Sequence, residues 1–135
     1  MNFITSEQFL YQSEKVQSEL IKWWKPQIGD LYTCSNSNYV KVIDEDVLAE
    51  YEINGSLKET IYCFNSKEDI VLPLLQIHHL IRFIKYKGHT YEIFKHADGE
   101  HSVNIYSYGC CKLCIDNIKL LQALWEITIK LIENK

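Results

Sequence analysis

The chain has 135 residues, of which 47% are hydrophobic and 24% charged. This balance is typical of a soluble globular protein and excludes a disordered chain, and no apolar run approaches the roughly 18 residues of a membrane span. The net charge of −4, with Arg82 as the single arginine among 14 basic residues, disfavours binding to a nucleic-acid backbone, which calls for a basic surface. We expect one domain, residues 1–135.

The first predicted element is a helix over about residues 5–24. Thr5 and Gln8 have the spacing of a capping box, and the apolar residues Phe9, Val16 and Leu20 then recur at helical spacing. Pro26 disfavours the helical conformation for the residue before it, so the helix should end near Trp24. This start has neither the basic residues nor the apolar segment of a secretory signal, and we therefore expect a cytoplasmic protein of a bacterial host cell.

Two hairpins are predicted over about residues 30–64. Residues 31–34 and 39–43 flank a turn-rich linker, and residues 51–53 and 60–64 flank an Asn-Gly-Ser turn signal. The acidic run Asp44, Glu45 and Asp46 lies between these hairpins, where we expect a solvated turn.

A second helix is predicted over about residues 73–87. Pro73 suits the first helical position, and Gly88 suits the left-handed position after the last turn.

A third hairpin follows over about residues 89–108, and its register can be predicted. A three-residue loop, 97–99, with Gly99 left-handed, pairs Ile93 with Val103 and Tyr91 with Ile105, which places all four apolar side chains on one face.

The last predicted helix covers about residues 116–133. Its apolar arc is unusually wide, so the helix is either deeply buried or shared with a partner, which raises a homodimer as a hypothesis. Because hairpins joined by short loops favour antiparallel pairing, the predicted class is α+β: an antiparallel sheet of hairpins with three helices packed on it.

The densest group of metal-binding side chains is Cys110, Cys111 and Cys114. Cys111 and Cys114 have half of a zinc-site spacing, but no second pair supplies the remaining ligands. We favour small apolar thiols that fill the passage from strand to helix, and expect no cofactor. His78 and His79 point about 100° apart on a helix, which disfavours a shared metal site. The odd total of five cysteines without a secretory signal indicates reduced thiols.

No catalytic motif is present, and no nucleophile, base and orienting group are brought together by spacing, so we predict that the protein is not an enzyme. Tyr and Trp are enriched at protein–protein hot spots, and an acidic cluster suits a basic partner. The candidate partner-binding residues are Trp24, Tyr32, Asp44, Glu45, Asp46, Tyr106 and Tyr108.

Three segments resemble small uncharacterised phage and prophage accessory proteins of low-GC Gram-positive bacteria. These are the W-K-P-x-x-G-D segment that begins at Trp24, the Ile70–Ile81 segment around Pro73, and the closing segment Ala123–Glu133. The resemblance supplies no catalytic residues. It implies a mobile-element accessory protein, a context in which inhibitors of host processes or of host defence are common.

The sequence therefore predicts a non-enzymatic phage or prophage protein that binds a host or phage protein. The alternative is a module that binds a small, nucleotide-like ligand or zinc. A membrane role is not expected, and binding to nucleic acid is disfavoured.

Overall fold

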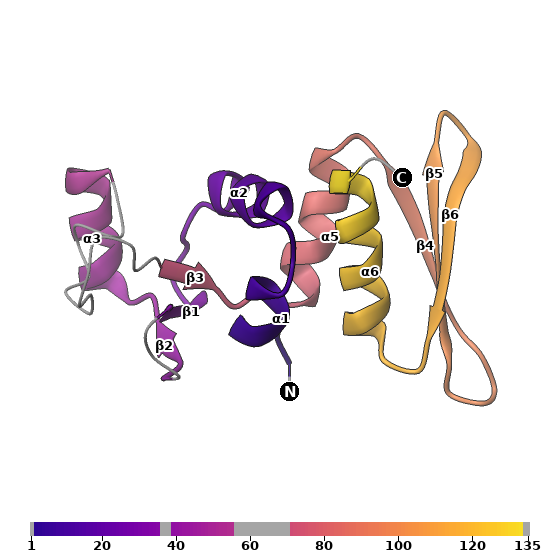
Figure 1. Ribbon diagram of the computed structural model, residues 1–135, viewed down its shortest axis with the longest axis horizontal. Helices are drawn as coiled ribbons and strands as arrows, with labels where there is room; N and C mark the ends of the chain where they lie inside the picture. The colour runs from indigo at the N-terminus through magenta and orange to yellow at the C-terminus, as the bar shows by residue number, and fades with distance from the viewer. Residues whose placement is uncertain (1, 36–38, 56–70, 134–135) are drawn as a thin grey trace.

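The computed structural model describes residues 2–35, 39–55 and 71–133. These residues combine helices with two three-stranded antiparallel sheets, which confirms the α+β class. The elements lie along one long axis, with α3 at one end and strands β4–β6 at the other (Figure 1). In chain order they are α1 (Ser6–Leu10), α2 (Glu14–Trp23), β1 (Leu31–Cys34), β2 (Lys41–Val42), α3 (Glu45–Asn54), β3 (Val71–Pro73), α5 (Ile77–Tyr86), β4 (Thr90–Lys95), β5 (His101–Ser107), β6 (Cys110–Asn117) and α6 (Leu120–Glu133).

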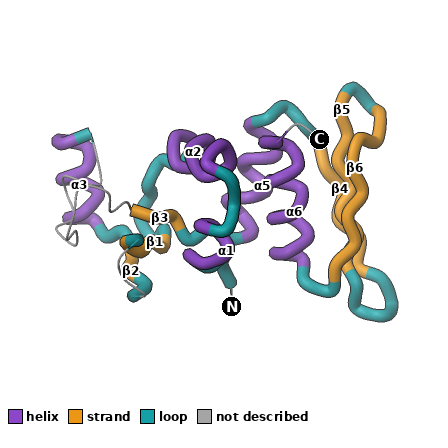
Figure 2. Tube along the Cα trace, viewed as in Figure 1, coloured by secondary structure: helices purple, strands orange, loops and turns teal. Residues whose placement is uncertain are grey.

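The larger sheet, of order β4-β5-β6, packs one face on α6, and no described helix covers its other face (Figure 2). The predicted register of its first hairpin is confirmed, since Ile93 pairs with Val103 and Tyr91 with Ile105. Gly99 has the predicted left-handed conformation, with φ of 90°. Val103 and Ile105 are fully buried, so the alternation of apolar and polar residues correctly identified the core-facing side.

The smaller sheet has the order β2-β1-β3. The predicted hairpin of β1 and β2 is confirmed by the pairing of Leu31 with Val42. The strand β3 was not predicted, and Pro73 lies in it rather than at the first position of the following helix, which begins at Ile77. Proline is tolerated there because β3 is an edge strand. Gly88, after the end of α5, is left-handed as predicted.

The predicted N-terminal helix is wrong in one respect, because two helices occupy its range. The capping box is confirmed: Gln8 N–H donates to Thr5 Oγ1 at 3.2 Å, and Thr5 N–H donates to Gln8 Oε1 at 3.1 Å. The chain then leaves the helix at Tyr11, and Ser13 caps α2 by accepting a hydrogen bond from Val16 N–H at 3.3 Å. Apolar residues keep helical spacing on both sides of this break, so the sequence pattern gave no sign of it.

The predicted strand at residues 51–53 is also wrong. Residues 45–54 form the helix α3, and Gly55 ends it in the left-handed conformation, with φ of 73°, instead of turning a hairpin. Asp44 caps α3 by accepting a hydrogen bond from Val47 N–H at 2.8 Å. Aspartate is favoured both in turns and at helix N-caps, so its presence did not distinguish the two. The predicted strand at 60–64 lies outside the described residues.

The C-terminal region differs from the prediction at the cysteine cluster. Residues 110–117 form β6, with a bulge where Ile105 and Tyr106 change register against it, so the last helix begins at Leu120 rather than near 116. The helix α6 lies between the large sheet and the helices α2 and α5. Its wide apolar arc is therefore covered by its own chain, and the observation that suggested a homodimer through this helix has an intramolecular explanation. Seven of its residues are buried, namely Leu121, Ala123, Leu124, Trp125, Ile127, Thr128 and Ile132.

None of the helices in the described ranges has the length and apolar character needed to cross a bilayer.

The break between α1 and α2 determines whether the substitution Ser13→Ala raises or lowers the stability of the protein. Replacing Ser13 with alanine should lower the free energy of unfolding by about 1 kcal/mol, because the first turn of α2 loses its cap. In an unbroken helix the same substitution would raise stability, since alanine is the better helix former. Urea denaturation measures the change, with Ser18→Ala, at an exposed position within α2, as the control. A stabilised Ser13→Ala variant would contradict the two-helix arrangement.

Candidate functional site

The segment Trp24–Asp30 forms a closed turn that joins α2 to β1. Trp24 still donates its N–H to Leu20 O at 2.9 Å but has an extended backbone, so α2 ends at the predicted place, close to Pro26. Gly29 has φ of 91°, a conformation that glycine adopts without strain, and Asp30 N–H returns to Gln27 O at 3.0 Å. The turn thus brings the Asp30 side chain back toward the indole of Trp24.

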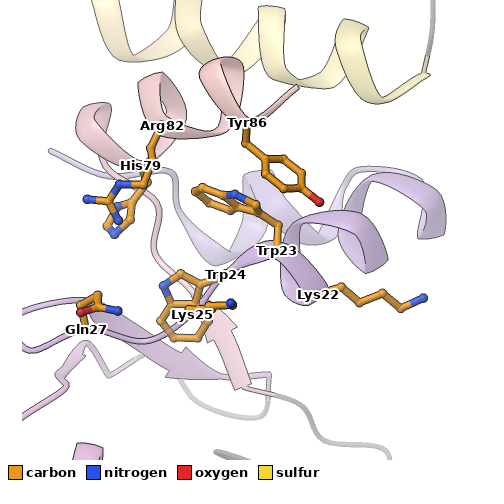
Figure 3. Close-up of a pocket in the computed structure, with 8 residues that line it drawn as sticks. All are labelled: Lys22, Trp23, Trp24, Lys25, Gln27, His79, Arg82 and Tyr86. Atoms are coloured by element: carbon orange, nitrogen blue, oxygen red, sulfur yellow. The ribbon is translucent and has the colours of Figure 1, made fainter. Parts of the chain in front are cut away.

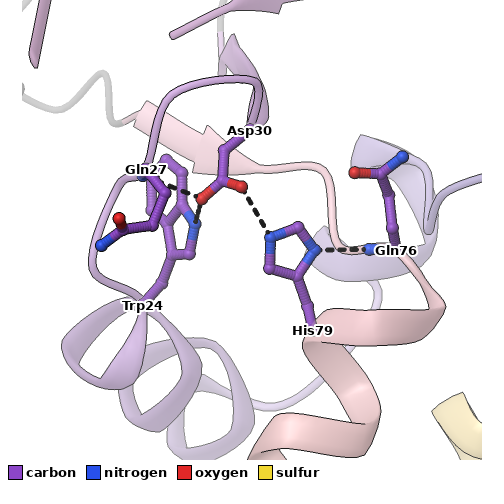
Figure 4. Close-up of polar contacts among 5 residues, drawn as sticks. All are labelled: Trp24, Gln27, Asp30, Gln76 and His79. Carbon is purple, nitrogen blue, oxygen red and sulfur yellow. Dashed lines mark hydrogen bonds and ion pairs between the residues drawn. The ribbon is translucent and has the colours of Figure 1, made fainter.

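Asp30 is the centre of a buried hydrogen-bond network (Figure 4). Its Oδ2 accepts from Trp24 Nε1–H at 3.0 Å and from Gln27 N–H at 3.1 Å, while its Oδ1 lies 3.0 Å from His79 Nε2 on α5. Asp30 is only 5% exposed and His79 only 1%. A carboxylate removed from water in this way is stabilised by donors, and three converge on it here.

The tautomer of His79 follows from its second contact. Gln76 N–H donates to His79 Nδ1 at 3.0 Å, so Nδ1 carries a lone pair and the neutral ring carries its hydrogen on Nε2. That hydrogen is donated to Asp30. Burial lowers the pKa of His79, against the opposing effect of the hydrogen bond and the charge of Asp30. The neutral form is therefore the one that fits this network.

The same arrangement disfavours a metal ion, although Asp30, His78 and His79 have potential ligand atoms within 4.8 Å of one another. Coordination through His79 Nε2 needs a lone pair on that nitrogen, with the hydrogen on Nδ1. The Gln76 N–H occupies Nδ1 instead. The rings of His78 and His79 nevertheless lie 4.0 Å apart between centroids, closer than their predicted 100° separation implied.

A cavity of about 430 Å³ lies beside the network, between the end of α2, the turn and α5. Aromatic rings form much of its wall. Trp23 makes a T-shaped contact with Phe83, with ring centroids 5.2 Å apart, and Tyr86 lies 6.4 Å from Trp23. The lining residues are Lys22, Trp23, Trp24, Lys25, Gln27, His79, Arg82 and Tyr86 (Figure 3).

The cavity is positively charged within an acidic protein. Lys22, Lys25 and Arg82 are exposed at its edge, and none of the three forms an ion pair with a carboxylate in the described part of the chain. A nearby lysine, Lys87, is different, since it lies 3.1 Å from Glu19. The chain's single arginine is thus placed at this cavity.

The predicted partner-binding residues do not form one surface. Trp24 is 8% exposed and Tyr32 is 4% exposed, so both are removed from the surface that was predicted to contain them. Of the two neighbouring indoles, Trp23 is the more accessible. Burial, with a smaller effect from Asp44, raises the pKa of Tyr32.

The remaining candidates are separated along the molecule. Asp44, Glu45 and Asp46 are exposed at the beginning of α3. Tyr106 lies on β5, and Tyr108 is fully exposed in the turn between β5 and β6. Figure 1 shows α3 and this turn at opposite ends of the long axis. A single acidic and tyrosine-rich surface is therefore not present among these residues.

The cysteine cluster is exposed on β6, which corrects the expectation that it fills a passage from strand to helix. Cys110, Cys111 and Cys114 are free, and no group of three metal-binding side chains within the described ranges includes them. Burial raises the pKa of the Cys114 thiol, as do, to a lesser extent, the nearby Asp116 and Cys111. Cys34 is buried and disulfide-bonded, so the prediction of reduced thiols is wrong for that residue.

A second polar cluster lies on the outer face of the large sheet, but its hydrogen bonds do not run in the direction that activates a serine nucleophile. Ser102 Oγ donates to Asp116 Oδ1 and also contacts His96 Nε2. Because the hydroxyl has one hydrogen, His96 acts as the donor to Ser102. A histidine that donates to the serine does not activate it as a base.

Sequence reasoning did not identify the residues that line the cavity, apart from Trp24. The only early signals were the W-K-P-x-x-G-D segment and the isolated arginine. The partners on α5 lie about 50 residues away in the chain, and no local pattern connects them to the turn.

Substitution of the central carboxylate should destabilise the protein strongly. In Asp30→Ala, the donors of Trp24, Gln27 and His79 lose their acceptor, and the free energy of unfolding should fall by about 3 kcal/mol or more. Urea denaturation measures this loss. The control Asp46→Ala removes an exposed carboxylate and should cost less than about 1 kcal/mol. Equal effects of the two substitutions would contradict the network.

The neutral state of His79 predicts a pH dependence of stability. Because the folded-state pKa of His79 is lowered, the unfolded chain takes up a proton below about pH 6.5 that the folded protein does not. The free energy of unfolding should therefore fall as the pH falls below this value, by up to about 1.4 kcal/mol per pH unit.

Denaturation at a series of pH values tests this assignment. His79→Gln should reduce the pH slope between pH 5 and about 6.5, whereas His78→Gln, at an exposed neighbour, should retain it. A wild-type slope in His79→Gln would show that other groups cause the dependence.

Comparison with known proteins identifies no relative of this chain. The chain matches no protein-family model, and the comparisons with curated proteins and with solved structures gave no match. The resemblance to phage accessory proteins therefore stays a prediction. The functional inference rests on the cavity and on the network that supports it.

Proposed function

We propose that this protein binds a small anionic molecule in the cavity between α2 and α5. The observation that carries the proposal is that Lys22, Lys25 and Arg82, without carboxylate partners among the described residues, all line one cavity of an acidic protein. Unpaired cations at the edge of a cavity attract an anion into it. A volume of about 430 Å³ suits a small organic ligand.

The network of Asp30 supports the site by fixing its walls. Trp24 and Gln27, in the turn, donate hydrogen bonds to Asp30, and His79 on α5 donates a third. Lys25 lies within that turn, and Arg82 is one helical turn after His79 on α5. The two cationic sides of the cavity are therefore joined through a buried interaction, and the site needs little reorganisation to accept a ligand.

The overall charge favours a small anion over a long one. Eighteen acidic residues against 14 basic ones leave the protein at −4, so a polyanion that extends past the cavity would meet a negative surface. We therefore favour the small-ligand alternative over the zinc module, since no group of three metal-binding side chains among the described residues includes Cys110, Cys111 or Cys114.

A protein partner is a second candidate function, favoured by one group of exposed apolar side chains. Ile28, Val40 and Val42 are each at least half exposed near the edge strand β2, and such groups often mark contact sites. We propose that a host or phage protein would bind there rather than through the residues predicted from the sequence.

The phage origin and the cytoplasmic location remain proposals beside this one. The disulfide of Cys34 weighs against the location, since disulfides are rare in a reducing cytoplasm.

Isothermal titration with pyrophosphate tests the anion site. The wild type should bind it, more weakly as salt increases. A variant with Lys22→Gln, Lys25→Gln and Arg82→Gln should bind at least about tenfold more weakly, a loss of about 1.4 kcal/mol. The matched control Lys15→Gln, Lys41→Gln and Lys112→Gln removes three exposed lysines elsewhere and should bind as the wild type does. Unchanged binding by the first variant, or no binding by the wild type, would overturn the proposal.

A further inference from the structure

We infer that the anionic group of the ligand is attached to a planar ring, as in a nucleoside phosphate. This inference rests on the proposed function, because it describes the remaining part of the molecule whose charge the three basic residues would neutralise. Its support comes from the aromatic wall of the same cavity and from one amide at its edge.

Trp23 provides a fixed surface for a ring. It is the last residue of α2 and is half-buried, and its T-shaped contact with Phe83, with an angle of 87° between the rings, holds the indole in one orientation. Phe83 itself is fully buried, so it anchors this contact in the core. An indole that is held in place but still lines a cavity loses little conformational entropy when a ligand stacks on it.

Tyr86 provides a second, largely exposed ring beside Trp23. It is the last residue of α5 and is 67% exposed. Its ring is tilted by 51° from that of Trp23, with centroids 6.4 Å apart, so the two rings are not stacked on each other. Exposed side chains change rotamer rapidly, and rotation of Tyr86 would bring it against a ring seated on Trp23. The apolar area covered in this way favours an aromatic ligand over a sugar phosphate.

The polar groups are arranged around this aromatic wall. Arg82 and Lys22 lie to either side of Trp23 in Figure 3, so an anionic group extending from a stacked ring meets a cation in either direction. Gln27 lies at one end of the cavity, and its side-chain amide makes no hydrogen bond within the described ranges. An amide offers both a donor and an acceptor, which matches the edge of a nucleobase.

Comparison of two probes that differ only in the ring tests this inference. AMP should bind at least about tenfold more tightly than ribose 5-phosphate, as expected for one base stacked on an aromatic side chain. Trp23→Leu should remove this preference, so that AMP and ribose 5-phosphate bind the variant equally. Tyr86→Leu should reduce the preference as well, and its exposed position makes it the safer variant if Trp23→Leu fails to fold.

The control Tyr11→Leu changes an exposed tyrosine away from this cavity and should bind AMP as the wild type does. Equal binding of AMP and ribose 5-phosphate, or a preference that survives both aromatic substitutions, would overturn the inference while the anion site stands. Binding of pyrophosphate without binding of AMP would likewise overturn the inference and leave the anion site standing. If the wild type does not bind pyrophosphate, the proposed function fails, and the inference that rests on it fails with it.

Discussion

The buried carboxylate of Asp30 is the constraint on which the arrangement of this protein depends. A charge at that depth is tolerated only with donors around it, and those donors come from an indole, a backbone amide of the turn and an imidazole of α5. Each donor fixes a different segment. The turn is closed by the first two, and α5 is held against the turn by the third. The cavity exists because these segments meet without filling the space between Trp23 and Arg82.

The network also links the histidine to its own helix. Because the backbone of Gln76 donates to His79 at the beginning of α5, the imidazole serves as the cap of that helix and as the donor to Asp30 at once. One side chain with two distinct nitrogens thus connects a helix start to a buried charge. This double use explains why the position suits neither a metal ion nor a charged imidazolium, although the surrounding residue types favour both.

Local patterns predicted the parts of the fold that depend on local physics. The capping box of Thr5 and the register of the hairpin around Gly99 follow from spacing and from turn chemistry, and both are confirmed. The helix α3 was mistaken for a strand because Asp44 and Gly55 suit turns as well as helix ends. The break at Ser13 was missed since its apolar neighbours keep helical spacing on both sides of it.

The candidate site was less predictable because its parts are distant in the chain. Trp24 was predicted to belong to a binding surface, whereas a tertiary hydrogen bond to Asp30 buries it. The pairing of Asp30 with His79 spans 49 positions. No periodicity carries information over that separation, and the cavity that results is a property of the assembled fold.

The position of α6 has a consequence for the order in which the protein can be made. It lies between the large sheet and the helices α2 and α5, and its Gln122 Oε1 accepts a hydrogen bond from Gln8 Nε2–H across 114 positions. On a ribosome, α6 is synthesised after all the other described elements, so the apolar faces that it covers stay open until the end of that synthesis. Phe9, whose ring stacks against that of Trp125, lacks this contact until α6 has been synthesised. Until α6 is made, those apolar faces are open to aggregation, and the contacts of α6 with α2 and α5 that cover them join residues far apart in the chain.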